Sequence, residues 1–188
     1  MNIESIIKER NKGWKKKPEI PEWVDLEDVS LDQFFTKPEI AKKYYLKTLK
    51  FLKKENINIE DCLFVEPSAG DGSFFKLLPK NQRIGIDLYP MAEGIIKKDF
   101  LNWTPPKTDK KIIFIGNPPF GYRAWLALNF MNHASKFADY IFFILPMSFQ
   151  SEGKGSSKHR VKGMKLIHSE SVPNDSFFEP SGKSIKIN

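Results

Sequence analysis

Hydrophobic side chains recur along the chain with two spacings, one typical of helices and one typical of buried strands. Helical spacing covers residues 38 to about 54–56 and residues 125–136, and Pro79 should end a third, short helix at residues 74–78. Short apolar runs between turn residues predict strands at 63–65, 83–88, 112–115, 140–145, 164–172 and 184–187. Helices that alternate with strands in this way predict an α/β fold, in which a mostly parallel sheet is covered on both faces.

The same pattern suggests how the chain is divided. Residues 1–30 are polar, basic and rich in proline, so we expect a partly irregular lead, followed by one domain over residues 31–188. Residues 150–163 are rich in glycine, serine and lysine and predict a loop. The strand pattern stops at Ile187 without a turn, which indicates a domain truncated at its C-terminus with no separate recognition domain after it.

Composition narrows the class of protein. No apolar stretch is long enough to span a bilayer and no signal peptide precedes the domain. The single cysteine, Cys62, excludes an internal disulfide and fits a reducing compartment, so we expect a cytoplasmic protein of a bacterium or of a virus-infected host cell. The 30 lysines and arginines exceed the 23 acidic residues, which favours a polyanionic partner, although an AT-rich genome would explain part of the excess. Metal binding is not predicted, because His133, His159 and His168 lack ligand spacing.

A turn of small residues follows the first predicted strand. Glu66 and Pro67 lead into Ser68-Ala69-Gly70-Asp71-Gly72, where the backbone can approach a ligand closely. The glycine spacing is neither that of a dinucleotide fingerprint nor that of a phosphate loop, and a tight turn without a ligand would also explain it.

Two acidic positions follow this turn. Asp87 ends the second strand, where a carboxylate can accept hydrogen bonds from the hydroxyls of a ribose. Asp99-Phe100 offers an acceptor and a ring suited to an adenine, but taken alone this pair fits a turn aspartate and a core phenylalanine better.

The most specific segment is Asn117-Pro118-Pro119-Phe120, directly after a buried strand. The prolines fix the backbone, so the Pro118 carbonyl and the Asn117 side chain can both accept from one exocyclic amine. Two such acceptors localise the lone pair of that nitrogen and stabilise the positive charge that develops when it attacks a methyl group. Phe120 offers a flat face on which a flipped base can stack.

Taken together, these motifs resemble the S-adenosylmethionine-dependent amino methyltransferases that make N6-methyladenine in DNA, especially restriction-modification and phage or viral enzymes. The resemblance covers about residues 31–188, including Phe143-Ile144-Leu145-Pro146-Met147-Ser148-Phe149 as a strand beside the base pocket. It implies a Rossmann-like methyltransferase domain with seven strands, the last antiparallel. It further implies that Glu66, Ser68, Gly70 and Gly72 hold the methionine part of the cofactor, Asp87 its ribose, and Asp99 and Phe100 its adenine. Phe35, Thr36 and Pro38 would close over it.

The chain departs from that family after Phe149, where no recognition region of substantial size follows. From the resemblance we expect a nucleic-acid substrate, DNA ahead of RNA. A partner subunit that supplies target recognition would explain the short C-terminal region. Lys154, Lys158 and Arg160 are candidate phosphate contacts in the 150–163 loop, which fits a solvated surface loop equally well. Protein glutamine methylation, and a silent subunit that keeps the fold, remain the alternatives.

Overall fold

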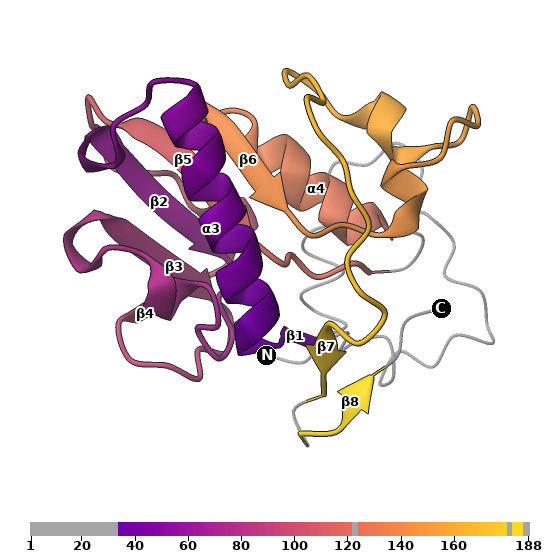
Figure 1. Cartoon of the computed structure of the whole chain (residues 1–188), viewed down its shortest axis with the longest axis horizontal. Helices are drawn as coiled ribbons and strands as arrows, with labels where there is room; N and C mark the ends of the chain where they lie inside the picture. The colour runs from indigo at the N-terminus through magenta and orange to yellow at the C-terminus, as the bar shows by residue number, and fades with distance from the viewer. Residues whose placement is uncertain (1–33, 122–123, 180–181, 186–188) are drawn as a thin grey trace. The chain divides into compact units, whose positions relative to one another are not determined.

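A parallel sheet of five strands forms the centre of the structure, a computed structural model that describes residues 34–121, 124–179 and 182–185 (Figure 1). The strands lie in the order β4-β3-β2-β5-β6 and every neighbouring pair is parallel. Their bounds are Cys62–Pro67 (β2), Arg83–Asp87 (β3), Ile95–Lys97 (β4), Lys111–Gly116 (β5) and Tyr140–Phe143 (β6). The chain runs outward from β2 through β3 to β4 and then returns to the other side of β2. The strand order therefore reverses between β2 and β5, and at such a point the carboxyl ends of the strands leave a crevice for a ligand.

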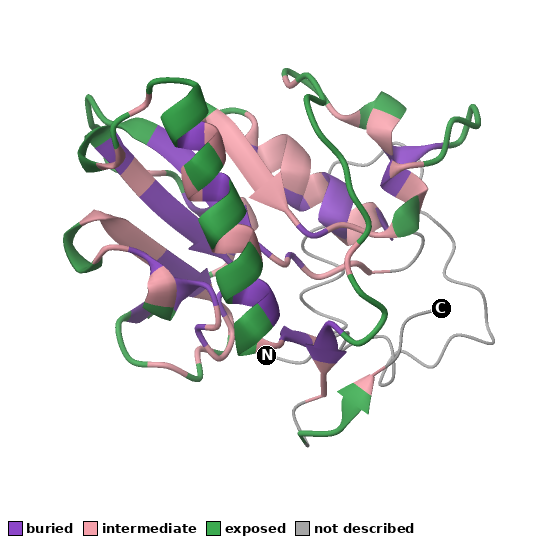
Figure 2. Cartoon of the chain, viewed as in Figure 1, coloured by how far each residue is buried: buried purple, intermediate pink, exposed green. Residues whose placement is uncertain are grey.

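One helix covers each face of this sheet. Helix α3 (Pro38–Lys54) packs Ala41 and Leu52 against a cluster that contains Phe64 and Ile113, whereas α4 (Trp125–Ala134) packs its side chains against the face that carries Phe114. Strands β2 and β5 alternate between these two clusters, so both of their faces are buried, as Figure 2 shows. Burial on both faces explains why these two strands are almost continuously apolar.

A second, smaller sheet is not paired with any strand of the first, but its Phe177 is buried in the same cluster as Phe64 and Ile113. It has the order β1-β7-β8, with bounds Phe35–Thr36 (β1), Phe177–Phe178 (β7) and Ser184–Ile185 (β8), and its pairs are antiparallel. Phe35 is paired with Phe178, and their ring centroids are 5.5 Å apart. This sheet places a late segment of the chain beside the strand that precedes α3.

Short 3-10 helices complete the description. Their bounds are Ile59–Asp61, Phe75–Leu77, Lys80–Gln82, Phe100–Asn102, Met147–Phe149 and Ser157–Arg160. None of the helices among the described residues is long and apolar enough to cross a membrane.

The structure confirms the α/β class, the mostly parallel sheet and the helix on each face. It also confirms the helices predicted from residue 38 and over 125–136, and the strands predicted at 63–65, 83–88, 112–115 and 140–145, to within a few residues at their ends. It corrects three expectations. The sheet has five strands in place of seven, and the antiparallel strands belong to the second sheet. Residues 74–78 form only a 3-10 turn, because Gly72 and Pro79 leave no room for a longer helix. Residues 164–172 are irregular: Leu166 and Ile167 are exposed and Met164 and Val172 are half-buried, so the segment lacks the alternating buried face of a strand. The predicted lead at residues 1–30 lies outside the described residues.

Candidate functional site

The glycine-rich turn, Asp87 and Asn117 meet at the carboxyl ends of β2, β3 and β5. The turn after β2 is fastened to β3, since Ala69 N–H donates to the Ile86 carbonyl across 2.9 Å and Gly70 N–H donates to Asp87 Oδ2 across 2.8 Å. It is fastened to the segment after β5 as well, because the Ser68 hydroxyl donates to the Asn117 carbonyl across 3.3 Å. Three motifs that are distant in sequence therefore form one site at the edge where the strand order reverses.

Strand β1 lies directly over the glycine-rich turn. Gly70 has φ +48°, and a Cβ atom at this position would lie 2.8 Å from Cε1 of Phe35. Only glycine permits both this backbone conformation and this approach of the ring. Gly72, with φ +80°, closes the turn by donating its N–H to the Ala69 carbonyl across 2.7 Å. Phe35 thus lies over the glycine-rich turn, while the closing of Phe35, Thr36 and Pro38 over a cofactor stays a prediction.

The Asn117 side chain is held in one orientation. Its Nδ2 donates to the Phe34 carbonyl across 3.0 Å, while its Oδ1 is buried and has no hydrogen-bond partner among the described residues. Two further buried oxygens in that part of the chain lack a partner, Thr36 Oγ1 and Glu66 Oε2. Buried polar atoms are nearly always hydrogen-bonded in proteins, so the oxygens of Asn117 and Glu66, on neighbouring segments at the ends of β5 and β2, mark a place where a ligand would supply the missing bonds.

Glu66 is the most unusual of these groups, because its side chain is 3% exposed at the end of β2. Burial raises the pKa of this carboxyl well above its ordinary value, and the negative charges of Asp71 and Asp87 raise it further, whereas a hydrogen bond from the Phe75 backbone opposes the shift. Gly116 makes room for it: with φ +148°, a Cβ atom there would come within 3.1 Å of Glu66 Cγ. The site therefore contains a carboxyl group that would ionise readily only beside a cationic ligand.

Asp87 is already engaged by the backbone on both oxygens. Oδ2 accepts from Gly70 N–H, and Oδ1 accepts from Tyr89 N–H across 2.7 Å. A carboxylate has about four lone-pair positions, so two remain for the hydroxyl groups of a ligand.

The sequence analysis did not single out two apolar side chains beside Asp87. Tyr89 is 48% exposed and Met91 is 60% exposed, and the Met91 N–H donates to the Gly70 carbonyl across 3.0 Å. The sequence signal that could have identified them is an aromatic residue two positions after Asp87, followed by Pro90.

Phe100 does not join the site. It is 3% exposed, and its ring packs in the core on the α4 side, against Trp103, Phe114, Phe130 and His133. Asp99 caps the short helix that begins at Phe100, accepting from Leu101 N–H and from Asn102 Nδ2, each across 3.1 Å. The expected contact of the Phe100 ring with an adenine is therefore corrected, because a ring enclosed by four others offers no free face. Asp99 still follows β4 at the same edge, beside Lys98, whose N–H donates to the Asp87 carbonyl.

The remainder of the catalytic segment runs from β5 toward α4. Pro118 is fully buried, and Pro119 and Phe120 are half-buried. The Phe120 carbonyl accepts from Ala127 N–H across 3.2 Å, so the segment is anchored on the helix behind it. On the opposite side of the site, Pro38 begins α3 immediately after β1.

Comparison with known proteins adds no family. No protein-family model matches the chain, and no curated protein matches it. Among the described residues, no group of three or more histidine, cysteine, aspartate or glutamate side chains could hold a metal ion.

The predicted basic loop is anchored on α4. Asn132 donates to the Arg160 carbonyl across 3.2 Å and accepts from Lys162 N–H across 2.9 Å. The Lys158 ammonium pairs with Glu152, and Arg160 Nη2 donates to the Ser157 hydroxyl across 3.3 Å. Lys154 is exposed. Their contact with phosphate remains a prediction, and the Glu152 partner reduces the charge that Lys158 can offer.

Proposed function

We propose that this protein transfers a methyl group from S-adenosylmethionine to the N6 amino group of adenine in DNA. The observation that carries the proposal is the fixed orientation of the Asn117 side-chain amide. Its nitrogen is held by the Phe34 carbonyl, so its buried oxygen is the acceptor that is left for a ligand. An adenine amino group would supply the missing donor.

The acceptor chemistry follows from this orientation. Asn117 Oδ1 accepts one hydrogen of the amine and the Pro118 carbonyl accepts the other, so the lone pair of the nitrogen is withdrawn from the ring and becomes nucleophilic. When the nitrogen bonds to the methyl carbon, the bond from that carbon to the sulfur of the cofactor would break and S-adenosylhomocysteine would leave as a neutral thioether. The same two oxygens would stabilise the positive charge on the nitrogen until it loses one proton to solvent. They are fixed in advance by the two prolines and by Phe34, so little reorganisation is needed when the charge appears. Half-buried Phe120 supplies a face for the base.

The residues present fit the proposed cofactor. When bound, S-adenosylmethionine supplies an electrophilic methyl group on a positively charged sulfur. Glu66 would hold the cationic methionine part, which explains a buried carboxyl with an unpartnered oxygen. Asp87 would accept from the ribose hydroxyls through its two remaining lone-pair positions, and exposed Tyr89 and Met91 would cover the adenine in place of Phe100.

Incubation with radiolabelled S-adenosylmethionine tests the proposal directly. Duplex DNA, single-stranded DNA and RNA are offered separately, and the digested nucleosides are separated and identified by mass. We expect N6-methyladenine from DNA with the native chain and about 10²–10³-fold less in the same time with Asn117→Ala. Product from RNA alone would move the assignment to RNA, and absence of N6-methyladenine from all three would refute the activity.

Calorimetric titration with S-adenosylmethionine separates the enzyme from a silent subunit of the same fold. The proposal requires saturable binding that is lost in Asp87→Ala, because that change removes the carboxylate that is assigned to the ribose. A chain that binds nucleic acid but not the cofactor would be the silent subunit.

A further inference from the structure

Helix α3 carries a row of lysines along its exposed face. Its 17 residues contain six lysines and a single acidic residue, Glu39 in the first turn. Lys43, Lys47, Lys50 and Lys54 are separated by four, three and four positions, so they lie on one face of the helix. All four are exposed, and Figure 2 shows an exposed strip along α3. We call these four residues the lysine stripe.

The stripe is unfavourable for the helix itself. Like charges three and four positions apart repel each other and destabilise an isolated helix, and no glutamate is placed to offset them after the first turn. Lys54 is favourable at the C-terminal end of the helix dipole, but this does not account for Lys43 or Lys47. Within the described part of the chain, an ion pair is found for only one member, Lys47. An external anion would relieve this repulsion.

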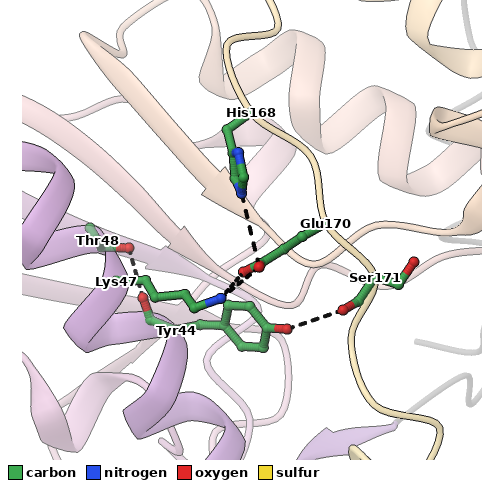
Figure 3. A network of polar contacts seen from close by, with 6 residues as sticks. All are labelled: Tyr44, Lys47, Thr48, His168, Glu170 and Ser171. Atoms are coloured by element: carbon green, nitrogen blue, oxygen red, sulfur yellow. Dashed lines mark hydrogen bonds and ion pairs between the residues drawn. The ribbon is translucent and has the colours of Figure 1, made fainter.

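A carboxylate already lies on the middle of the stripe. The segment that contains Glu170 and Ser171 runs beside α3, and both oxygens of Glu170 lie 2.5 Å from Lys47 Nζ (Figure 3). His168 Nε2 lies 4.0 Å from the same carboxylate, and the Tyr44 hydroxyl donates to the Ser171 carbonyl across 3.5 Å. Glu170 is the only acidic residue between Glu152 and Asp175. The stripe thus has room for an oxyanion and binds one through its central lysine.

The position of the stripe connects it with the candidate site. Helix α3 begins at Pro38, directly after the strand whose Phe35 lies on the glycine-rich turn. From there the helix extends for about 25 Å. Successive phosphates of one strand of a duplex are about 3.4 Å apart along the axis, so a helix of this length could follow several phosphates.

We propose that the lysine stripe binds the sugar–phosphate backbone of the nucleic acid whose base enters the site, and that a phosphate replaces Glu170 on Lys47. The identity of the polymer rests on the proposed function. The charge and the geometry of the stripe do not depend on it.

Fluorescence anisotropy with labelled oligonucleotides, in single-stranded and duplex form, measures this binding without any methyl transfer. The test variant carries Lys43→Gln, Lys50→Gln and Lys54→Gln. The matched control carries Lys80→Gln, Lys107→Gln and Lys136→Gln, which removes the same charge from exposed positions on other elements. Circular dichroism verifies that both variants are folded.

We expect the stripe variant to bind at least about tenfold more weakly than the control variant. Its dependence of log affinity on log salt should be shallower by roughly 2–3, since each phosphate contact contributes about 0.7–0.9 to that slope. Glu170→Gln should bind more tightly than the native chain, and Asp109→Asn, an equal change of charge on the loop before β5, should not.

Equal losses in the stripe and control variants would overturn the proposal, because net charge alone would then explain binding. Displacement of the oligonucleotide by polyglutamate at equal charge concentration would overturn it as well, since the stripe would then suit an acidic protein. If a stripe variant binds nucleic acid normally and still methylates adenine, the role of the lysine stripe is refuted and the proposed function stands. If binding depends on the stripe but no adenine is methylated, the proposed function is refuted and the role of the stripe stands.

Discussion

The side-chain amide of Asn117 donates to the backbone carbonyl of Phe34 across 3.0 Å, although the two residues are 83 positions apart in the chain. This bond decides which end of the amide is left for a ligand. It also joins the segment after β5 to the strand that covers the glycine-rich turn. The orientation of the proposed catalytic acceptor therefore depends on the same strand as the cover of the proposed cofactor site.

Truncation of this side chain should separate catalysis from cofactor binding. In Asn117→Ala we expect the rate of methyl transfer to fall by about 10²–10³-fold, the loss typical when one preorganised group that stabilises transition-state charge is removed. The affinity for S-adenosylmethionine should remain nearly unchanged, because the turn and Asp87 are intact. Labelled-methyl transfer and calorimetry measure the two quantities. A large loss of cofactor affinity would contradict the role assigned to Asn117.

Gly70→Ala should damage the site more than its backbone conformation alone explains. The new methyl group would lie 2.8 Å from the Phe35 ring, so β1 must shift. Gly163→Ala is the matched control, because Gly163 also has a positive φ but has no atom within 4 Å of the added methyl group. Each variant should lose about 1–2 kcal/mol of unfolding free energy from strain in the left-handed region, and Gly70→Ala should lose more, together with cofactor affinity. Equal losses in urea unfolding would show that Phe35 does not constrain the turn.

Stability should depend on pH through Glu66. Its pKa is raised in the folded state by burial, so the folded protein binds the proton more tightly than the unfolded chain does. The stabilising contribution is complete below the unfolded pKa of about 4.3. It is lost as the pH rises from there through the folded pKa, because ionisation then favours the unfolded chain. We expect the unfolding free energy of the native chain to fall over this range relative to that of Glu66→Gln. Parallel curves from urea titrations at a series of pH values would argue against a raised pKa.

Phe100 and Tyr89 should respond to substitution in opposite ways. Phe100→Leu leaves a gap among four rings and should cost roughly 1–3 kcal/mol of stability with little change in cofactor affinity. Tyr89→Ala removes an exposed ring beside Asp87, so its effect on stability should stay within about 0.5 kcal/mol while cofactor binding weakens. Unfolding curves and calorimetry on both variants provide the comparison. A selective loss of cofactor affinity in Phe100→Leu would restore the adenine contact that the packing excludes.

Local patterns predicted the elements whose burial depends on their own sequence. Strands β2 and β5 are apolar throughout because they are covered on both faces, and α3 has a proline at its start and a clear apolar side. The meeting of Gly70, Asp87 and Asn117 was also predictable, because each follows a parallel strand and such strands end at one edge.

Features that depend on distant partners were not predictable in this way. Strands β1 and β7 have two residues each, and only their pairing with each other gives them a strand conformation. Residues 164–172 carry apolar side chains at suggestive spacing, but Leu166 and Ile167 stay exposed while Val172 packs against the core. The position of the Phe100 ring was not predictable either. It lies in the core because it packs against Phe114, Phe130 and His133, which are distant in the sequence.

The pairing of β1 with β7 has a consequence for synthesis on the ribosome. The five strands of the central sheet have all been translated once Phe143 has emerged, and domains fold progressively as the chain is made. Phe35 and Thr36 must wait much longer, because their partners Phe177 and Phe178 are added late. Phe177 also belongs to the core cluster that contains Phe64 and Ile113. We therefore expect a nascent chain that stops before Phe177 to lack both part of its core and the cover of its glycine-rich turn, so that an incomplete translation product would be less stable and inactive.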